Sequence, residues 1–178
     1  MHLNEKTLSS QPAYDGCIFT ITKDIAELED GTTARRDVLH HPGGVGVIPV
    51  TDENEVLLVK QFRYPFSEIT TEIPAGKLDY GESHSECGKR ELLEETGCTC
   101  SEYTYLGEIY PVPAYDTEII HIYMARGLEH QKQNLDEGEF LDVIKIPLSK
   151  AAEMVMNNEI KDAKSKIAIL MVARILRI

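Results

Sequence analysis

The stretch GKLDYGESHSECGKRELLEETGC, residues 76–98, decides the fold of this chain. Ser83 is followed three residues later by Glu86, which is the pattern of a capping box at a helix start. Gly97 supplies a left-handed residue that ends a helix. The stretch therefore predicts a helix over residues 84–96.

Three glutamates of that helix, Glu91, Glu94 and Glu95, fall within one arc at about 100° per residue. Like charges at this spacing destabilise a helix by ~0.2–0.5 kcal/mol per pair. A solvated acidic face is the simplest explanation. However, Gly76 and Gly81 allow tight turns just before the helix. A loop, a helix and converging carboxylates suit a hard divalent cation such as Mg²⁺, which takes oxygen ligands.

The overall composition excludes several classes of protein. The chain has 178 residues and a net charge of −12, which argues against nucleic acid or anionic lipid as a partner. It contains no apolar run long enough to cross a bilayer and no secretory pattern at its start, so a cytoplasmic location is expected. The four cysteines show no disulfide pattern, and packing is favoured over a zinc site for Cys98 and Cys100.

The rest of the chain alternates β-prone runs with turns and ends in two helical patterns. Two β-prone runs around the turn EDG predict an antiparallel ribbon within residues 16–40. Short β-branched runs then predict a central sheet, with a Pro-Ala-Gly turn ending one of them. The predicted strands lie within 43–50, 55–64, 68–78, 103–110, 117–128 and 140–146, and the helices within 148–160 and 162–178.

The spacing of the acidic stretch resembles the signature of the Nudix hydrolases. Every fixed position of that signature is filled, and Cys98 is the one departure, at a position where an aliphatic residue is usual. From about residue 36 onward the chain resembles the ADP-ribose pyrophosphatase branch. The matching residues are Gly76, Glu82, Arg90, Glu91, Leu92, Glu94, Glu95 and Gly97.

The resemblance implies an α/β Nudix fold, in which a mixed β-sheet is sandwiched between helices (α/β/α) and preceded by an N-terminal antiparallel β-ribbon. It divides the chain into a ribbon over residues 1–40, acting as a dimerisation arm, and a Nudix hydrolase domain over 41–178. A homodimer is therefore expected.

The resemblance also implies an activity, namely Mg²⁺-dependent hydrolysis of ADP-ribose or a related nucleoside diphosphate sugar. The products from ADP-ribose would be AMP and ribose 5-phosphate. Mn²⁺ is the alternative cation. Two rival functions stay open, a pyrophosphatase that prefers GDP-mannose or a UDP-sugar and a ligand-binding or sensor module without activity.

Carried over residue by residue, the pattern makes Glu91 and Glu95 the principal metal ligands, with Glu95 also counted as catalytic. Arg90 is expected to hold a carboxylate in place by pairing with Glu86 or Glu94 along the helix. Glu137, on a late acidic loop, is the candidate general base. The remaining candidate metal ligands are Glu82, Glu94, Glu139 and the carbonyl oxygen of Ala75.

The resemblance also supplies candidate substrate contacts. Arg63 resembles the arginine that holds the diphosphate, and its planar guanidinium suits that contact. Pro113, sixteen residues beyond Gly97, is typical of ADP-ribose pyrophosphatases rather than dinucleoside polyphosphate hydrolases. Further candidates are Glu72 near the substrate, Arg36 reaching the nucleotide across a dimer interface, and Tyr115 or Tyr64 stacking on adenine.

Overall fold

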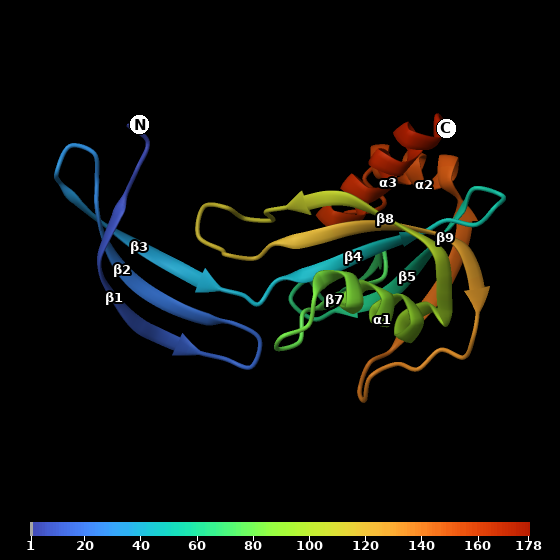
Figure 1. The fold of residues 1–178 in the computed structure, drawn as a ribbon, viewed down its shortest axis with the longest axis horizontal. Helices are drawn as coiled ribbons and strands as arrows, with labels where there is room; N and C mark the ends of the chain where they lie inside the picture. Colours follow the sequence, from blue (N-terminus) through green and yellow to red (C-terminus); the bar gives the residue numbers. More distant parts are fainter. Residues whose placement is uncertain (1) are drawn as a thin grey trace. The chain divides into compact units, whose positions relative to one another are not determined.

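The computed structural model describes residues 2–178 and separates them into two compact units (Figure 1). The first unit contains the residues up to Gly43 together with Tyr110–Ile119. The second contains Gly44–Ile109 and Ile120–Ile178.

The first unit is built on a three-stranded antiparallel sheet in the order β1-β2-β3. Its second and third strands form the hairpin that the EDG turn predicts, and Gly31 takes φ 79° there. The first strand was not predicted, because its residues KTLSSQPAYD lack a β-branched run and are all exposed. The strands are β1 Lys6–Asp15, β2 Thr20–Glu27 and β3 Thr33–His40.

The second unit contains two sheets. In the four-stranded sheet, ordered β7-β4-β9-β8, β4 and β9 run parallel and the other pairs are antiparallel. The three-stranded sheet is antiparallel, in the order β10-β5-β6. The strands are β4 Gly44–Pro49, β5 Glu55–Arg63, β6 Glu68–Glu72, β7 Ala75–Lys77, β8 Cys98–Ile109, β9 Ile120–His130 and β10 Leu141–Pro147.

Side chains of the central strands alternate between two hydrophobic clusters. Val45 and Val47 of β4 pack with Leu92 of α1 (His84–Thr96) on one face. Ile48 packs on the other face with Val172 of α3 (Ala163–Leu176), as do residues of α2 (Leu148–Met156). This two-residue period is that of a strand buried on both faces. Figure 1 shows α1 on one side and α2 and α3 on the other, which confirms the predicted α/β/α sandwich.

The predicted ends of the glutamate-rich helix are confirmed. The Ser83 hydroxyl accepts a hydrogen bond from the backbone N–H of Glu86, and the Glu86 side chain accepts one from the backbone N–H of Ser83. Gly97 ends the helix at φ 66°. These caps fix where the glutamate side chains leave the helix.

The prediction of a Pro-Ala-Gly turn was wrong. Residues Ala75–Lys77 form the short strand β7, in which Ala75 pairs with Gly46 of β4. Pro74 precedes the strand, and the Pro74 carbonyl accepts a hydrogen bond from the N–H of Val47. The sequence indicated a turn because proline and glycine are typical of turns, whereas pairing with β4 decides the conformation.

The cysteine prediction is consistent with this core. Cys98 is buried and Cys100 is half-buried, and both are free thiols, as are Cys17 and Cys87. Among residues 2–178, no helix has both the length and the apolar character needed to cross a membrane.

Gly88 of α1 provides a test of the packing between the helix and the sheet. An added Cβ would lie 2.1 Å from the Tyr103 hydroxyl oxygen and 2.7 Å from Val45 Cγ1. Tyr103 cannot move away easily, because its ring stacks on that of Tyr123 at 4.2 Å. Overpacking at 2.1 Å should cost about 2–3 kcal/mol, against the ~1 kcal/mol that alanine contributes to a helix, so Gly88→Ala should destabilise the fold by about 1–2 kcal/mol net.

Urea unfolding measures this difference in the free energy of unfolding. Glu153→Ala, at an exposed position of α2 away from Tyr103, is the control and should change stability by about 0.5 kcal/mol or less. A Gly88→Ala protein as stable as the parent would contradict this packing.

Candidate active site

A cleft of about 580 Å³ opens beside the N-terminal end of β7 and the middle of α1. The late acidic loop forms another wall and Gln61 of β5 also lines the cleft, so four separate segments of the chain meet here. Its lining residues are Gln61, Ala75, Gly76, Lys77, Asp79, Arg90, Glu91, Glu94, Asp136, Glu137, Gly138 and Glu139.

Glu95 is the most buried carboxylate of α1, with 3% of its surface exposed. Its Oε2 accepts a hydrogen bond of 2.9 Å from the backbone N–H of Ala75. Burial raises the pKa of Glu95 to about 8; the Ala75 hydrogen bond opposes that rise, while the charges of Glu91 and Glu139 add to it. The charge of Lys164 also favours ionisation but does not outweigh burial, so Glu95 keeps its proton below about pH 8.

Glu91 lies directly against the backbone of β7. A Cβ on Gly76 would lie 1.7 Å from Glu91 Oε1, so only glycine leaves room for this carboxylate. Burial raises the pKa of Glu91, the Arg90 guanidinium opposes the rise, and the charges of Glu94 and Glu139 add to it. This close approach gives Gly76 a physical role in the sequence pattern.

Arg90 is the cation that bonds to the carboxylates around the cleft. Its Nε and Nη2 each donate to the Glu82 carboxylate at 2.9 Å, and its Nη1 donates to Glu91 at 2.7 Å and Glu94 at 2.9 Å. The Arg90 guanidinium lowers the pKa of Glu82 to about 2. Pairing with Glu94 was expected; no bond from Arg90 to Glu86 is present among residues 2–178, because the Glu86 carboxylate caps the helix.

The acidic loop reaches the same cleft, where Glu137 and Glu139 both form part of the lining. The Glu139 carboxylate accepts a 3.0 Å hydrogen bond from Gln61 Nε2 on β5. Its charge raises the pKa of both Glu91 and Glu95. Gln61 was missed from the sequence, since an amide within a β-strand carries no signal of a site.

The donor set of this cleft fits a hard divalent cation. Its candidate ligands are carboxylate oxygens and a backbone carbonyl, the atoms that Mg²⁺ and Mn²⁺ prefer over nitrogen or sulfur donors. Within residues 2–178, no three acidic, histidine or cysteine side chains converge in the geometry of a metal site. Instead, the carboxylates of Glu82, Glu91 and Glu94 bond to the Arg90 guanidinium, with N···O distances of 2.7–2.9 Å.

A second depression, also of about 580 Å³, lies beside Arg63 and Glu72. Arg63 donates from Nε and Nη2 to the two oxygens of Glu72, at 2.7 and 2.8 Å. Burial opposes ionisation of Glu72, but the Arg63 and Lys164 cations together lower its pKa to about 2. Lys164 was missed from the sequence, because an isolated lysine in an amphipathic helix resembles a solvated residue.

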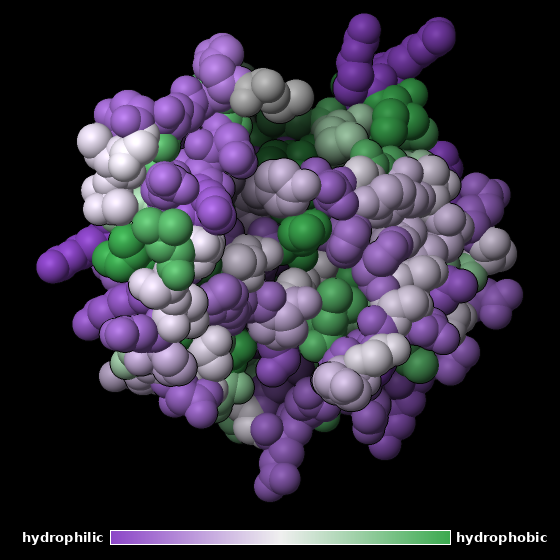
Figure 2. All heavy atoms as spheres, turned by 60° about the vertical axis from the view of Figure 1, so that its left-hand side comes forward, coloured by the Kyte–Doolittle hydropathy of each residue, from purple (hydrophilic) through white to green (hydrophobic). Residues whose placement is uncertain are grey.

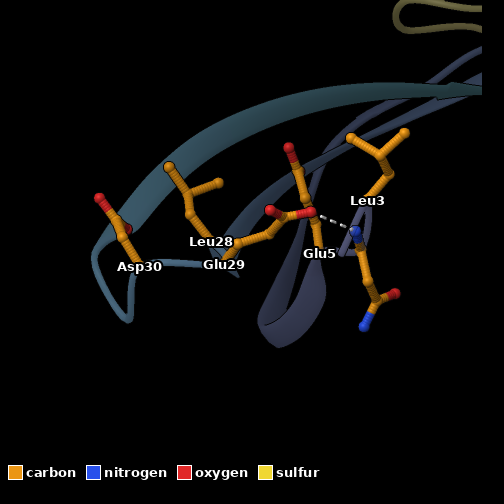
Figure 3. A pocket seen from close by; sticks show the side chains of 6 residues that line it. Leu3, Glu5, Leu28, Glu29 and Asp30 are labelled. Atoms are coloured by element: carbon orange, nitrogen blue, oxygen red, sulfur yellow. Dashed lines mark hydrogen bonds between the residues drawn. The ribbon is translucent and has the colours of Figure 1, made fainter. Parts of the chain in front are cut away.

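Three of the other candidate substrate contacts, Arg36, Pro113 and Tyr115, belong to the first unit. Arg36 on β3 is held by Glu5, with hydrogen bonds of 2.9 and 2.6 Å. Figure 3 shows Glu5 with Leu3, Leu28, Glu29 and Asp30 around a depression in this unit. Pro113 lies in the loop 110–119, and the exposed Tyr115 bonds through its carbonyl to the N–H of Leu39. Tyr64, in the second unit, is also exposed.

The fold and the cleft define this chain as a member of the Nudix hydrolases. The model of the NUDIX domain matches residues 40–167, and the chain belongs to that family. The predicted Nudix resemblance is confirmed.

Curated relatives cover most of the chain. An ADP-ribose pyrophosphatase of Bacillus subtilis (strain 168) is 38% identical over 94% of this chain and 91% of its own length. A methanol dehydrogenase activator of Bacillus methanolicus is 39% identical over 93% of this chain and 90% of its own length. A GDP-mannose pyrophosphatase of Escherichia coli (strain K12) is 32% identical over 83% of each.

A solved structure supports the fold. The crystal structure of an ADP compounds hydrolase superposes with a TM-score of 0.88, covering 99% of this chain and 96% of its own, at 21% sequence identity.

The raised pKa of Glu95 predicts a pH-dependent stability in the presence of a chelator. Between the ordinary value of 4.5 and about 8, the unfolded chain releases this proton while the folded chain keeps it. Raising the pH through this window therefore destabilises the fold, on the order of a few kcal/mol. Glu95→Gln, whose side-chain oxygen can still accept from Ala75, should melt at a higher temperature than the parent at pH 8 and about equally at pH 5.

Thermal melting at the two pH values measures the effect. Glu102→Gln, the same change at an exposed site on β8, is the control and should follow the parent. If Glu95→Gln gives no greater gain at pH 8 than at pH 5, Glu95 does not titrate in this window.

Proposed function

We propose that this protein hydrolyses the diphosphate bond of a nucleoside diphosphate sugar, with ADP-ribose as the preferred substrate and AMP and ribose 5-phosphate as products. The observation that carries the proposal is the cleft in which Glu91, Glu95 and the acidic loop meet. The 38% identity to a full-length relative named ADP-ribose pyrophosphatase supports the choice of substrate.

Catalysis by this site needs a divalent cation, and we infer Mg²⁺ with Mn²⁺ as the alternative. The ligands would be Glu91 and Glu95, with Glu82, Glu94, Glu139 and the Ala75 carbonyl completing or supporting the set. Such ions neutralise charge on phosphoryl oxygens and lower the pKa of bound water. A chain of net charge −12 otherwise repels a diphosphate, so positive charge in the cleft serves substrate entry as well.

The protein's own groups would bind the substrate and move the proton. Glu137 is the candidate general base, and its place in the cleft lining supports this role. Arg63 would bind the diphosphate while Glu72 holds its guanidinium in one orientation. Arg90 would keep the carboxylates of α1 in their working positions.

Contacts to the nucleotide remain proposals that rest on the family resemblance. Arg36 would reach the nucleotide across a dimer interface, which requires it to exchange its present partner Glu5. Tyr115 or Tyr64 would stack on the adenine, and both rings are exposed. Pro113 would shape the loop that favours ADP-ribose.

Two alternatives have specific support. The relative named GDP-mannose pyrophosphatase favours a different sugar nucleotide for the same chemistry, as would a UDP-sugar. The relative named methanol dehydrogenase activator favours an effect on another protein, by a module that could bind its ligand without cleaving it. All four box glutamates are present here, which favours hydrolysis over binding alone.

We also propose a cytoplasmic homodimer that binds neither nucleic acid nor membrane. In the described part of the first unit, Ala26 is the one buried hydrophobic residue, so its sheet has no core of its own. Leu3, Leu8, Tyr14 and Ile18 are all at least half exposed. A small sheet of this kind is stabilised by packing on another surface. On the face drawn in Figure 2, hydrophobic side chains form separate patches among hydrophilic ones.

A panel assay tests the proposed function. Purified protein with Mg²⁺ should release AMP from ADP-ribose with a higher kcat/KM than it releases the monophosphate from GDP-mannose or a UDP-sugar. Glu95→Gln should lower kcat by a factor of about 100 or more, because it removes a charged oxygen from the proposed metal site. Glu102→Gln should keep full activity. A protein that binds ADP-ribose without releasing AMP would be a sensor instead.

Light scattering tests the dimer. At micromolar concentration the expected mass is twice the 20.0 kDa of one chain. A monomer under these conditions would contradict the dimerisation arm and the contact of Arg36 with the nucleotide across it, and the panel assay would still test the hydrolysis.

A further inference from the structure

The Glu72 carboxylate is unusually well satisfied for a buried group. It is 3% exposed, and both its oxygens accept hydrogen bonds from more than one donor. Oε1 accepts from Arg63 Nε at 2.7 Å and from the Thr70 hydroxyl at 2.6 Å. Oε2 accepts from Arg63 Nη2 at 2.8 Å and from Lys164 Nζ. Four donors fix the plane of this carboxylate.

Lys164 is the donor that comes from a distant part of the chain. It lies in the first turn of α3, 92 residues beyond Glu72, and its side chain is 11% exposed. Its Nζ also lies 3.1 Å from Asp162 Oδ1. Asp162 caps α3 by accepting from the N–H of Ser165, so the lysine is fixed from both sides.

The same turn of α3 contacts the segment between Glu72 and the cleft. The Ser165 hydroxyl oxygen accepts a 2.8 Å hydrogen bond from the N–H of Ile73. Two residues further on, the N–H of Ala75 donates to Glu95. The start of α3 therefore supports the backbone that leads from Glu72 into the proposed metal site.

Arg63 retains donors that can reach a ligand. Two of its five N–H groups bond to Glu72, and its side chain is 40% exposed. Arg63 lines the depression beside Glu72, together with Lys164 of α3. One edge of this planar group is thus bound to Glu72, and the orientation of that carboxylate decides where the other edge points.

We propose that Lys164 is a positioning residue for substrate binding, which holds Glu72 in the one orientation that directs the free edge of Arg63 toward the diphosphate. This inference rests on the proposed function, because Arg63 is taken as the diphosphate ligand. Lys164 does not touch the substrate. It acts through Glu72, so its loss should weaken binding more than it slows the chemical step.

Steady-state kinetics on the best substrate of the nucleotide-sugar panel provide the first test. Lys164→Met keeps the length of the side chain and removes its charge. It should raise KM about tenfold and change kcat less than about threefold, the size expected for one charge-assisted hydrogen bond. Lys164→Arg, which restores a buried cation, should recover most of the loss. Lys150→Met is the control, since Lys150 pairs with the surface residue Glu153 on α2, away from the depression beside Arg63, and should leave KM unchanged.

A double mutant shows whether the effect passes through Arg63. Once Arg63 is replaced by Ala, adding Lys164→Met should raise KM no further. Additive effects of the two substitutions would overturn the proposal, and so would a Lys164→Met protein with the parent's KM.

A second readout does not depend on hydrolysis. The Arg63 Nε–H proton bonded to Glu72 should give a protected NMR signal, identified by its absence in Arg63→Ala. That signal should be lost or shifted in Lys164→Met and retained in Lys164→Arg and Lys150→Met. An unchanged signal in Lys164→Met would overturn the positioning role. A parent protein that cleaves no nucleotide sugar would overturn the proposed function, and this signal would still decide whether Lys164 orients Arg63.

Discussion

The structure depends on how one short helix tolerates several carboxylates on the side that faces β7. Arg90 neutralises most of the repulsion, because its guanidinium bonds to Glu82, Glu91 and Glu94 at 2.7–2.9 Å. Glu95 is outside the reach of this cation and is held by a backbone N–H instead. The helix is thus stable enough to fold. Two of its carboxyl groups, Glu91 and Glu95, still have raised pKa values, so a bound cation would favour their ionised forms.

The packing of helices against the sheets fixes the positions of these carboxylates and of the groups around them. Alternating side chains bury β4 between α1 on one face and α3 on the other, so neither helix can shift without opening the core. This fixed distance lets Gly76 lie against Glu91 and lets the start of α3 reach Glu72. Strand β5 completes the arrangement by holding Glu139 of the acidic loop through Gln61. The packed layers therefore position groups that come from six separate segments, namely β5, β6, β7, α1, the acidic loop and α3.

Features with a local cause could be predicted, and those with a distant cause could not. The ends of α1 follow from Ser83, Glu86 and Gly97, which act on their own neighbours. In contrast, β7 exists because β4 offers it a pairing edge, and β1 exists because β2 does. Neither segment has the run of β-branched residues that is typical of a strand. The sequence therefore indicated a turn at β7 and no regular element at β1.

By itself, the sequence determined the helix with its glutamates, the resemblance to the Nudix hydrolases and the acidic loop as a candidate part of the site. Those features are encoded in residue type and short spacing, which act over one or two helical turns. Only the tertiary structure decided that Arg90 bonds to Glu82 rather than Glu86, that Gln61 holds Glu139, and that Lys164 shares the Glu72 carboxylate with Arg63. The last two contacts join residues 78 and 92 positions apart, and packing of the two sheets against the helices brings them together.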